Sequence, residues 1–263
     1  MFNLIKSSCW TDKKPKKGAD HEKNINGKVF AEDSLIVAMG ITMGGEKVIL
    51  GLMQTGTENK KAIADFLRDL LSRGLRVDEG LLVIVDGSKG FLSSVKEVFE
   101  KKAVIQRCQW HKRENVISYL PKDEQEFMRK RLQRAYDRPT YAEAKDALLE
   151  ILKFLGCRNL SAAKSLEEGL EETLTLHRLG VYALVGTSLK TTNCLETING
   201  QIEKYCSRVS YWKNSSQKQR WLTSSLLAIE PGLRRIKGYD HLPMLRDAVQ
   251  KDIGIQFKER RVA

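Results

Sequence analysis

Two carboxylates and a Cys-x-x-His motif are the residues of this chain whose types and spacing could do chemistry. Asp86 follows the unbroken apolar run Leu81–Val85, which is typical of a strand buried on both faces of a sheet. A carboxylate at the end of such a strand stands where open α/β sheets place their reacting groups. Glu196 lies far along the chain, at the start of another predicted helix, with Cys108 and His111 in between.

Each carboxylate also has a structural interpretation. Asp86 could cap the helix predicted to begin near Ser88, because aspartate is a favoured N-cap residue. Asn193-Cys-Leu-Glu196 fits a capping box, in which the glutamate reaches back to the start of its own helix. The residue pattern alone leaves the role of Asp86 open and favours the capping role for Glu196.

Cys108 and His111 could form half of a zinc site. A structural zinc site needs four ligands at matching spacing, and the remaining cysteines and histidines are too scattered to complete one. We therefore favour a role for this pair in packing or in positioning the end of the preceding strand.

Aromatic residues next to cations are a second feature that suggests a ligand. Trp110 is followed by Lys112 and Arg113, and Trp212 is followed by Lys213. An aromatic ring can stack on a base while a cation holds its phosphate, although a single tryptophan more often belongs to the core. Trp110 is the strongest candidate for a nucleic-acid contact because it is nearest to the two carboxylates.

Mixed α/β elements are predicted to position these residues. Gly44-Gly45 predicts the turn of a hairpin, and apolar residues at helical spacing predict a helix that Gly74 ends. The predicted order is strand 35–43, strand 47–53, helix 58–73, strand 81–85, a helix carrying Phe91 to Phe99, and strand 103–106. Beyond Cys108 the pattern is helical, with a capping box at Thr140-x-x-Glu143 and a further helix over roughly 162–176.

The predicted domains follow from these patterns. Residues 11–24 hold one apolar side chain, Ala19, so we expect residues 1–25 to be a disordered basic tail. The α/β core is predicted to begin at residues 26–107 and to be interrupted by a helical insertion over 108–190. Residues 191–263 supply its last helix and a basic helical C-terminal part.

The charge of the chain favours a polyanionic partner. The net charge is +12, with eleven Lys/Arg against five Asp/Glu over residues 101–140 and thirteen against five over 204–263. Nucleic acid is the usual partner of such segments, although a solvated surface is the alternative. No aliphatic run is long enough to span a bilayer and the start of the chain lacks the apolar stretch of a signal peptide. The five scattered cysteines fit a reducing cytosol, so a cytoplasmic location is expected.

Several stretches in the same order resemble one family. They are 83–91, 106–115, 171–180, 190–199 and 211–214. Over roughly residues 26–250 the chain resembles the catalytic portion of the Mutator-type (IS256-like) DDE transposases of bacterial insertion sequences.

The resemblance implies a fold and an activity. The fold is an RNase H-like mixed sheet with an all-helical insertion between the second and third acids. The activity is DNA strand cleavage and strand transfer with Mg²⁺ or Mn²⁺ in a two-metal site. Asp86 matches the second acid and Glu196 the third, both as catalytic residues and metal ligands, and Cys108 and His111 match the family's signature. The implied partners are transposon-end and target DNA and further copies of the chain, with no membrane, in a bacterial cytoplasm and on the nucleoid when DNA is bound.

The sequence departs from the family at the first acid. The matching position holds Asn26, and the polar residues 13–24 before it cannot form the central strand expected there. We therefore expect that strand to be lost, residues 1–25 to be unrelated to the family, and this truncated or degenerate copy to be impaired. The alternative is a catalytically dead remnant that binds DNA or dimerises; an RNA-cleaving nuclease with the same metal site is a third possibility.

Overall fold

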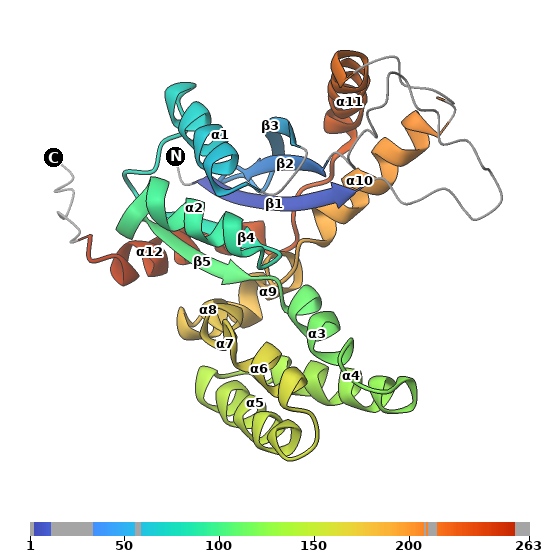
Figure 1. The fold of residues 1–263 in the computed structure, drawn as a ribbon. Coiled ribbons are helices and arrows are strands. Elements are labelled where there is room, and N and C mark those ends of the chain that lie inside the picture. Colours follow the sequence, from blue (N-terminus) through green and yellow to red (C-terminus); the bar gives the residue numbers. More distant parts are fainter. Residues whose placement is uncertain (1–2, 12–33, 56–58, 208, 210–214, 256–263) are drawn as a thin grey trace, which may run out of the picture.

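A five-stranded mixed sheet forms the centre of the protein. The computed structural model describes residues 3–11, 34–55, 59–207, 209 and 215–255. The strand order is β3-β2-β1-β4-β5 (Figure 1). The strands are β1 (Asn3–Thr11), β2 (Ser34–Ile41), β3 (Lys47–Thr55), β4 (Leu81–Val85) and β5 (Ala103–Arg107). β2 runs antiparallel to β1 and β3, whereas β4 runs parallel to β1 and β5, so the expected α/β class is confirmed.

The central strand comes from the N-terminal residues, which corrects two predictions. The disordered tail over 1–25 and the lost strand are both wrong for Asn3–Thr11, because this segment pairs with β2 on one side and β4 on the other. Leu4 lies opposite Ile41, and Lys6 lies beside Ile84. The physical reason is that a strand is held by backbone hydrogen bonds to its neighbours, which local composition does not reveal. Residues 12–25 and Asn26 lie outside the described residues.

The side chains of strand β2 show that both faces of the sheet are buried. Leu35, Val37, Met39 and Ile41 join one apolar cluster, whereas Ile36 and Ala38 join another, as expected from side chains that alternate along a strand. β4 is buried along its whole length, which fits its unbroken aliphatic sequence.

Helices cover both faces. One apolar cluster packs α1 (Lys60–Ser72) and α2 (Lys89–Phe99) on the sheet. Another packs the opposite face against α8 (Thr175–Arg178), α9 (Tyr182–Leu189), α10 (Asn193–Cys206), α11 (Ser215–Ile229) and α12 (Leu242–Asp252). Single-turn 3₁₀ helices lie at Glu100–Lys102, Glu230–Gly232 and Tyr239–His241.

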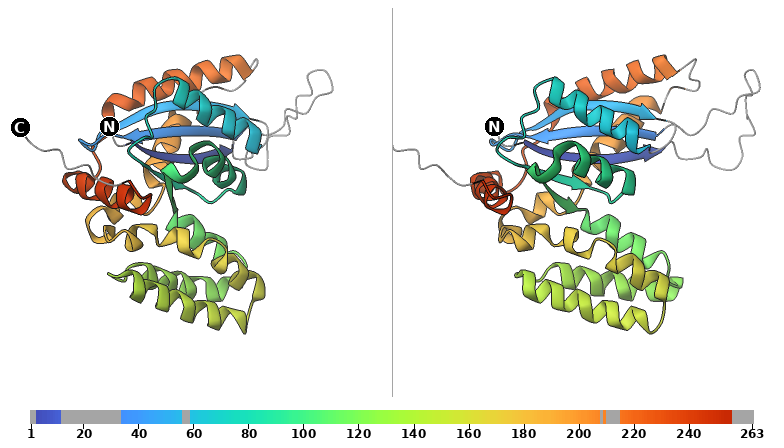
Figure 2. Two further views of the ribbon diagram at one scale, coloured as in Figure 1. Left: turned by 90° about the vertical axis from the view of Figure 1, so that its left-hand side faces the viewer. Right: turned by 60° about the vertical axis from the view of Figure 1, so that its left-hand side comes forward.

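The helical segment between β5 and α8 has a core of its own. It contains α3 (Gln109–Ile117), α4 (Lys122–Tyr136), α5 (Tyr141–Gly156), α6 (Leu160–Glu167) and α7 (Leu170–Thr173). Their buried side chains form one cluster that runs from Val116 to Leu174. Figure 2 shows these helices as a layer on the β5 side of the sheet, and we refer to them below as the helical insertion.

Two local predictions in the insertion had different outcomes. The capping box is confirmed, since the Thr140 hydroxyl accepts from the Glu143 amide and the Glu143 carboxylate accepts from the Thr140 amide. The single helix over 162–176 is instead three short helices, α6 to α8. Glu168 and Gly169 separate α6 from α7, and Gly169 has a φ of +70°, which a helix does not accommodate.

Candidate functional site

Asp86 directly follows the carboxyl end of β4, whose last residue, Val85, pairs with Arg107 at the end of β5. Its Oδ1 accepts a hydrogen bond of 3.2 Å from the Ser88 amide. The N-cap residue of α2 is Ser88, whose Oγ accepts from the Phe91 amide at 3.4 Å. The alternative role of Asp86 as the helix cap is therefore wrong, and its carboxylate is left half-buried at the edge of the sheet.

Glu196 lies in the first turn of α10 and does not form the predicted capping box. Asn193 is inside the helix, and the N-cap residue Thr192 makes no side-chain hydrogen bond to the helix terminus. The Thr192 hydroxyl instead lies 3.4 Å from Glu196 Oε1. The carboxylate is thus free of the structural role that the pattern favoured.

Cys108 and His111 lie between the two acids. Cys108 directly follows β5 and is fully buried, and its amide donates to Val85 O at 2.7 Å. Its Sγ is 3.2 Å from His111 Nδ1, and His111 Nε2 is 3.8 Å from Glu196 Oε1. Thr192 Oγ1 lies 3.2 Å from His111 Nδ1 and 3.5 Å from Cys108 Sγ. The ends of β4 and β5 and the start of α10 therefore meet at one place.

The charges at this place favour a cationic histidine. Burial lowers the pKa of His111, but the hydrogen bond and charge of Cys108, together with the charges of Asp86 and Glu196, raise it above its usual value. Burial raises the pKa of Cys108, and the hydrogen bond and charge of His111 outweigh that effect and lower it. Both carboxylates thus act on one imidazole, although they come from segments far apart in the sequence.

The described segments bring two carboxylates, those of Asp86 and Glu196, to the surroundings of His111. Within residues 34–55, 59–207 and 215–255, no group of three or more His, Cys, Asp and Glu is arranged to hold a metal ion. The sequence of β1, Asn-Leu-Ile-Lys-Ser-Ser-Cys-Trp-Thr, contains no Asp or Glu. The predicted first-acid position, Asn26, lies outside the described residues. Within the described residues, these two carboxylates offer the oxygen ligands that hard divalent cations prefer.

The residues predicted to contact DNA differ in how exposed they are in the structure. Trp110 is 39% exposed, and its ring meets the His111 ring edge-on at 4.8 Å, so its contact with DNA stays a prediction. Lys112 does not fit its predicted role. It is fully buried, and its ammonium donates to Ser165 O at 2.6 Å and to Glu168 O. An ammonium that is enclosed and already bound to carbonyl groups cannot reach a phosphate.

The other candidates remain predictions. Arg113 donates to the Glu114 carboxylate at 3.1 Å and to Gln133 Oε1 at 2.5 Å, so its guanidinium is largely engaged within the protein. Trp212 and Lys213 lie outside the described residues.

Three residues at or near the site were not recognised from the sequence. Thr192 contacts both halves of the Cys-His pair and Glu196, and it stands in the Lys190–Asn199 stretch that carried part of the resemblance. Arg107 and Glu168 join the Asp86 segment to the insertion. Arg107 adjoins the Cys-x-x-His motif, but no local signal marked Glu168.

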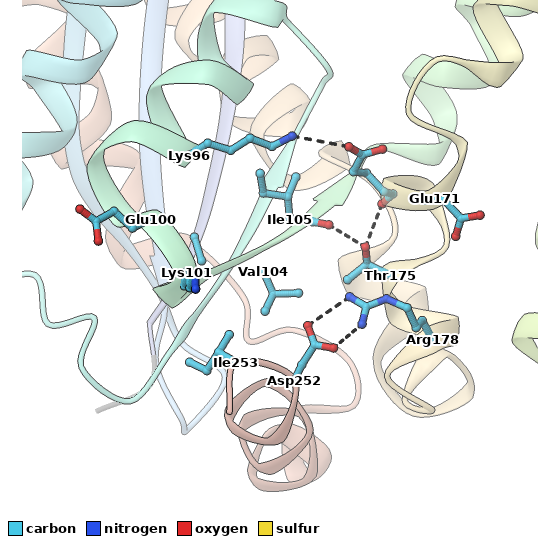
Figure 3. A pocket seen from close by; sticks show the side chains of 12 residues that line it. Lys96, Glu100, Lys101, Val104, Ile105, Glu171, Thr175, Arg178, Asp252 and Ile253 are labelled. Atoms are coloured by element: carbon cyan, nitrogen blue, oxygen red, sulfur yellow. Dashed lines mark hydrogen bonds and ion pairs between the residues drawn. The ribbon is translucent and has the colours of Figure 1, made fainter. Parts of the chain in front are cut away.

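A cavity of about 550 Å³ lies elsewhere (Figure 3). It borders the amino-terminal half of β5, whereas Asp86 and Cys108 stand at the carboxyl ends of their strands. Thr175 Oγ1 donates to Ile105 O at 2.6 Å there, and Arg178 pairs with Asp252. Three cations and four carboxylates line it, namely Lys96, Lys101, Arg178, Glu100, Glu171, Glu172 and Asp252. This balance does not favour a polyanion.

Comparison with known proteins gives one family. A model of the Mutator family of transposases matches residues 23–229. The chain is 32% identical over 212 residues to the transposase for insertion sequence element ISRM5 of Rhizobium meliloti, covering 81% of this chain and 52% of that protein. It is 28% identical over 198 residues to the transposase for IS256 in transposon Tn4001 of Staphylococcus aureus, covering 73% and 48%. The chain thus spans about half the length of these relatives. Among the described helices, none combines the length and apolar character needed to cross a membrane.

Proposed function

Because this chain belongs to the Mutator family of transposases, we propose that it is the catalytic part of a DDE-type transposase for an insertion sequence. Asp86 is the second acid and Glu196 the third. The observation that carries this proposal is the meeting of the end of β4, the Cys108–His111 pair and the first turn of α10. The Cys108 amide donates to the carbonyl of Val85, the residue before Asp86. His111 Nε2 lies 3.8 Å from Glu196 Oε1. Neither carboxylate is used as a helix cap, which leaves both available for chemistry.

The arrangement of the strands supports an RNase H-like fold. A central strand is flanked by an antiparallel hairpin on one side and by two parallel strands on the other. The second acid follows one of those parallel strands, and the helical insertion separates it from the third acid. This is the arrangement that the resemblance implies.

DNA is the partner that fits this proposal. The net charge of +12 favours a polyanion, and Trp110 offers an exposed ring beside the acidic site. Further copies of the chain are the second expected partner. The expected location is the bacterial cytoplasm, on the nucleoid when DNA is bound.

Mg²⁺ or Mn²⁺ is the proposed cofactor, held by Asp86 and Glu196. When bound, such ions activate the attacking oxygen and stabilise the leaving oxygen of a phosphodiester. Two carboxylates carry less charge than three, so we propose that this copy binds metal weakly and cleaves DNA poorly. The reason is the missing carboxylate, since the strand expected to be absent is present as β1.

Nicking of supercoiled plasmid DNA in Mn²⁺ tests this proposal. The wild type is expected to nick weakly, Asp86→Ala and Glu196→Ala to be inactive, and Asn26→Asp to be faster than the wild type. Glu203→Gln is the matched control, because Glu203 is an exposed residue further along α10. Equal nicking by the wild type and both alanine variants would overturn the assignment of the acids. Efficient nicking by the wild type would overturn the proposed impairment.

The alternative is a remnant that binds DNA or dimerises without cleaving. It predicts retention of plasmid DNA in a gel shift that weakens steeply with salt. It also predicts no nicking by the wild type or the Asn26→Asp variant. Recovery of cleavage in Asn26→Asp separates the two functions.

A further inference from the structure

Arg107 is a buried cation that donates hydrogen bonds to Gly87 and Glu168 rather than to Asp86 or Glu196. It is the last residue of β5 and is 4% exposed. Its Nη2 donates to Gly87 O at 3.2 Å, and its Nη1 donates to Glu168 O at 3.1 Å. Gly87 directly follows Asp86, and Glu168 begins the turn between α6 and α7. One guanidinium therefore joins the Asp86 segment to the helical insertion.

Two glycines allow the guanidinium to lie this close to the backbone. Gly87 has a φ of +102°, and a Cβ at that position would lie 2.1 Å from Arg107 Nε. Gly169 has a φ of +70°, and its Cβ would lie 2.3 Å from Arg107 Nη1. Any larger residue at either position would have to displace the arginine. The guanidinium thus fills a gap that both segments leave for it.

Glu168 and Lys112 fix the insertion side of this contact. Lys112 donates to Ser165 O and Glu168 O, and its ammonium lies 3.5 Å from the Glu168 carboxylate. The same carboxylate lies 3.4 Å from Arg107 Nη2. Burial raises the pKa of Glu168, but the charges of Arg107 and Lys112 outweigh that effect and lower it. Two buried cations therefore hold one turn of the insertion.

We propose that Arg107 is a positioning residue that ties the place of the Asp86 carboxylate to the docking of the helical insertion. The residues on both sides of Asp86 are held from β5, because the Cys108 amide binds Val85 O and Arg107 binds Gly87 O. A planar guanidinium is suited to this bridge, since its separate N–H groups reach two acceptors in fixed directions. The functional part of this inference rests on the proposed role of Asp86.

Amide hydrogen exchange measured by mass spectrometry tests the bridge. Gly169→Ala should speed exchange by roughly tenfold in the peptide covering residues 84–92, because exchange there depends on local opening, although residue 169 lies in the insertion. Gly180→Ala is the matched control, because Gly180 has a φ of +71° and a Cβ added there would meet nothing within 4 Å. Unchanged exchange over 84–92 in Gly169→Ala would overturn the proposal.

Arg107→Lys tests the geometry separately from the charge. One ammonium cannot reproduce the fork, so exchange should rise over both 84–92 and 165–174 while residues 141–156 in α5 stay protected. Mn²⁺ binding followed by electron paramagnetic resonance should weaken by about tenfold, the usual effect of losing a group that orients a ligand. Arg129→Lys, a change in α4 whose guanidinium pairs with Glu114, should leave both readouts unchanged.

The outcomes separate this inference from the proposed function. If Arg107→Lys speeds exchange over 165–174 alone and leaves Mn²⁺ binding at its wild-type strength, Arg107 merely docks the insertion and the inference is wrong. If the wild type and Asp86→Asn respond identically to Mn²⁺, the proposed function fails. In that case, the rate of amide hydrogen exchange over residues 84–92 in the Gly169→Ala variant still decides whether Arg107 joins the Asp86 segment to the insertion.

Discussion

Replacing Gly87 with alanine should destabilise the protein far more than replacing Gly74. The two glycines have nearly the same φ, +102° at Gly87 and +101° at Gly74. A non-glycine residue in this region costs about 1–2 kcal/mol, and the lower entropy of the unfolded alanine chain offsets about 0.4–1 kcal/mol. At Gly74 nothing lies within 4 Å of the added Cβ, so the net loss there should be about 1 kcal/mol.

At Gly87 the added Cβ meets Arg107, which must move. Displacing it breaks the hydrogen bonds to Gly87 O and Glu168 O. Glu168 O keeps the Lys112 ammonium, so Gly87 O and the buried guanidinium are the groups left unpaired, at a cost of about 1–3 kcal/mol each. The Gly87→Ala variant should therefore lose roughly 3 kcal/mol more than Gly74→Ala. For a chain of this length that is a difference in melting temperature of about 6–12 °C. Thermal and urea unfolding of both variants by circular dichroism gives the comparison, and equal losses would refute the contact as we describe it.

Three further predictions concern the strand, a buried cation and a buried histidine. Ile5→Pro should lower the unfolding free energy by roughly 3 kcal/mol, because Ile5 pairs with Gly40 on one side and Val83 on the other and proline cannot donate in a central strand. Asp78→Pro is the control, since Asp78 takes the second position of a turn closed by the hydrogen bond from Gly80 N to Val77 O, where proline is favoured. Similar melting temperatures for the two variants would contradict the central position of β1 in the sheet. Lys112→Met should lower stability by roughly 3 kcal/mol, since Ser165 O loses its donor and the Glu168 carboxylate loses one of its two cations. It should keep the salt dependence of DNA binding; a shallower salt slope in filter binding would show that Lys112 reaches phosphate after all. Burial lowers the pKa of His177 below its usual 6.5, and its neutral ring can donate to Tyr136 O or Arg138 O. The unfolded chain therefore binds a proton there more readily, so wild-type stability should be fully present above pH 6.5 and fall as the pH drops below it. In urea unfolding, His177→Gln should lose less stability over that range than the wild type, and an equal loss would argue against this group.

The sequence predicted the elements whose pattern is local. The Gly44-Gly45 turn marked the β2–β3 hairpin, an unbroken aliphatic run marked β4, and Thr140-x-x-Glu143 marked the start of α5. Each of these signals is contained within a few residues, and the corresponding side chains are buried or bonded as expected.

The features that the sequence missed depend on distant partners. The segment Asn3–Thr11 has no clear alternation, and it is a strand because β2 and β4 lie on either side of it. Lys112 was predicted to be a surface cation because nothing nearby in the sequence indicates that Ser165 and Glu168 enclose it. The capping pattern around Glu196 pointed to a local role, whereas Thr192 and His111 contact its carboxylate in the fold.

Thermal unfolding with and without Mn²⁺ tests most directly whether Asp86 and Glu196 form one cation site. A ligand that binds only the folded protein raises its stability by mass action, so Mn²⁺ should raise the melting temperature of the wild type and of the Glu203→Gln control. Asp86→Asn and Glu196→Gln should each abolish that rise, because either carboxylate alone is a poor site. A rise of equal size in the wild type and in both variants would place the metal elsewhere and contradict the account.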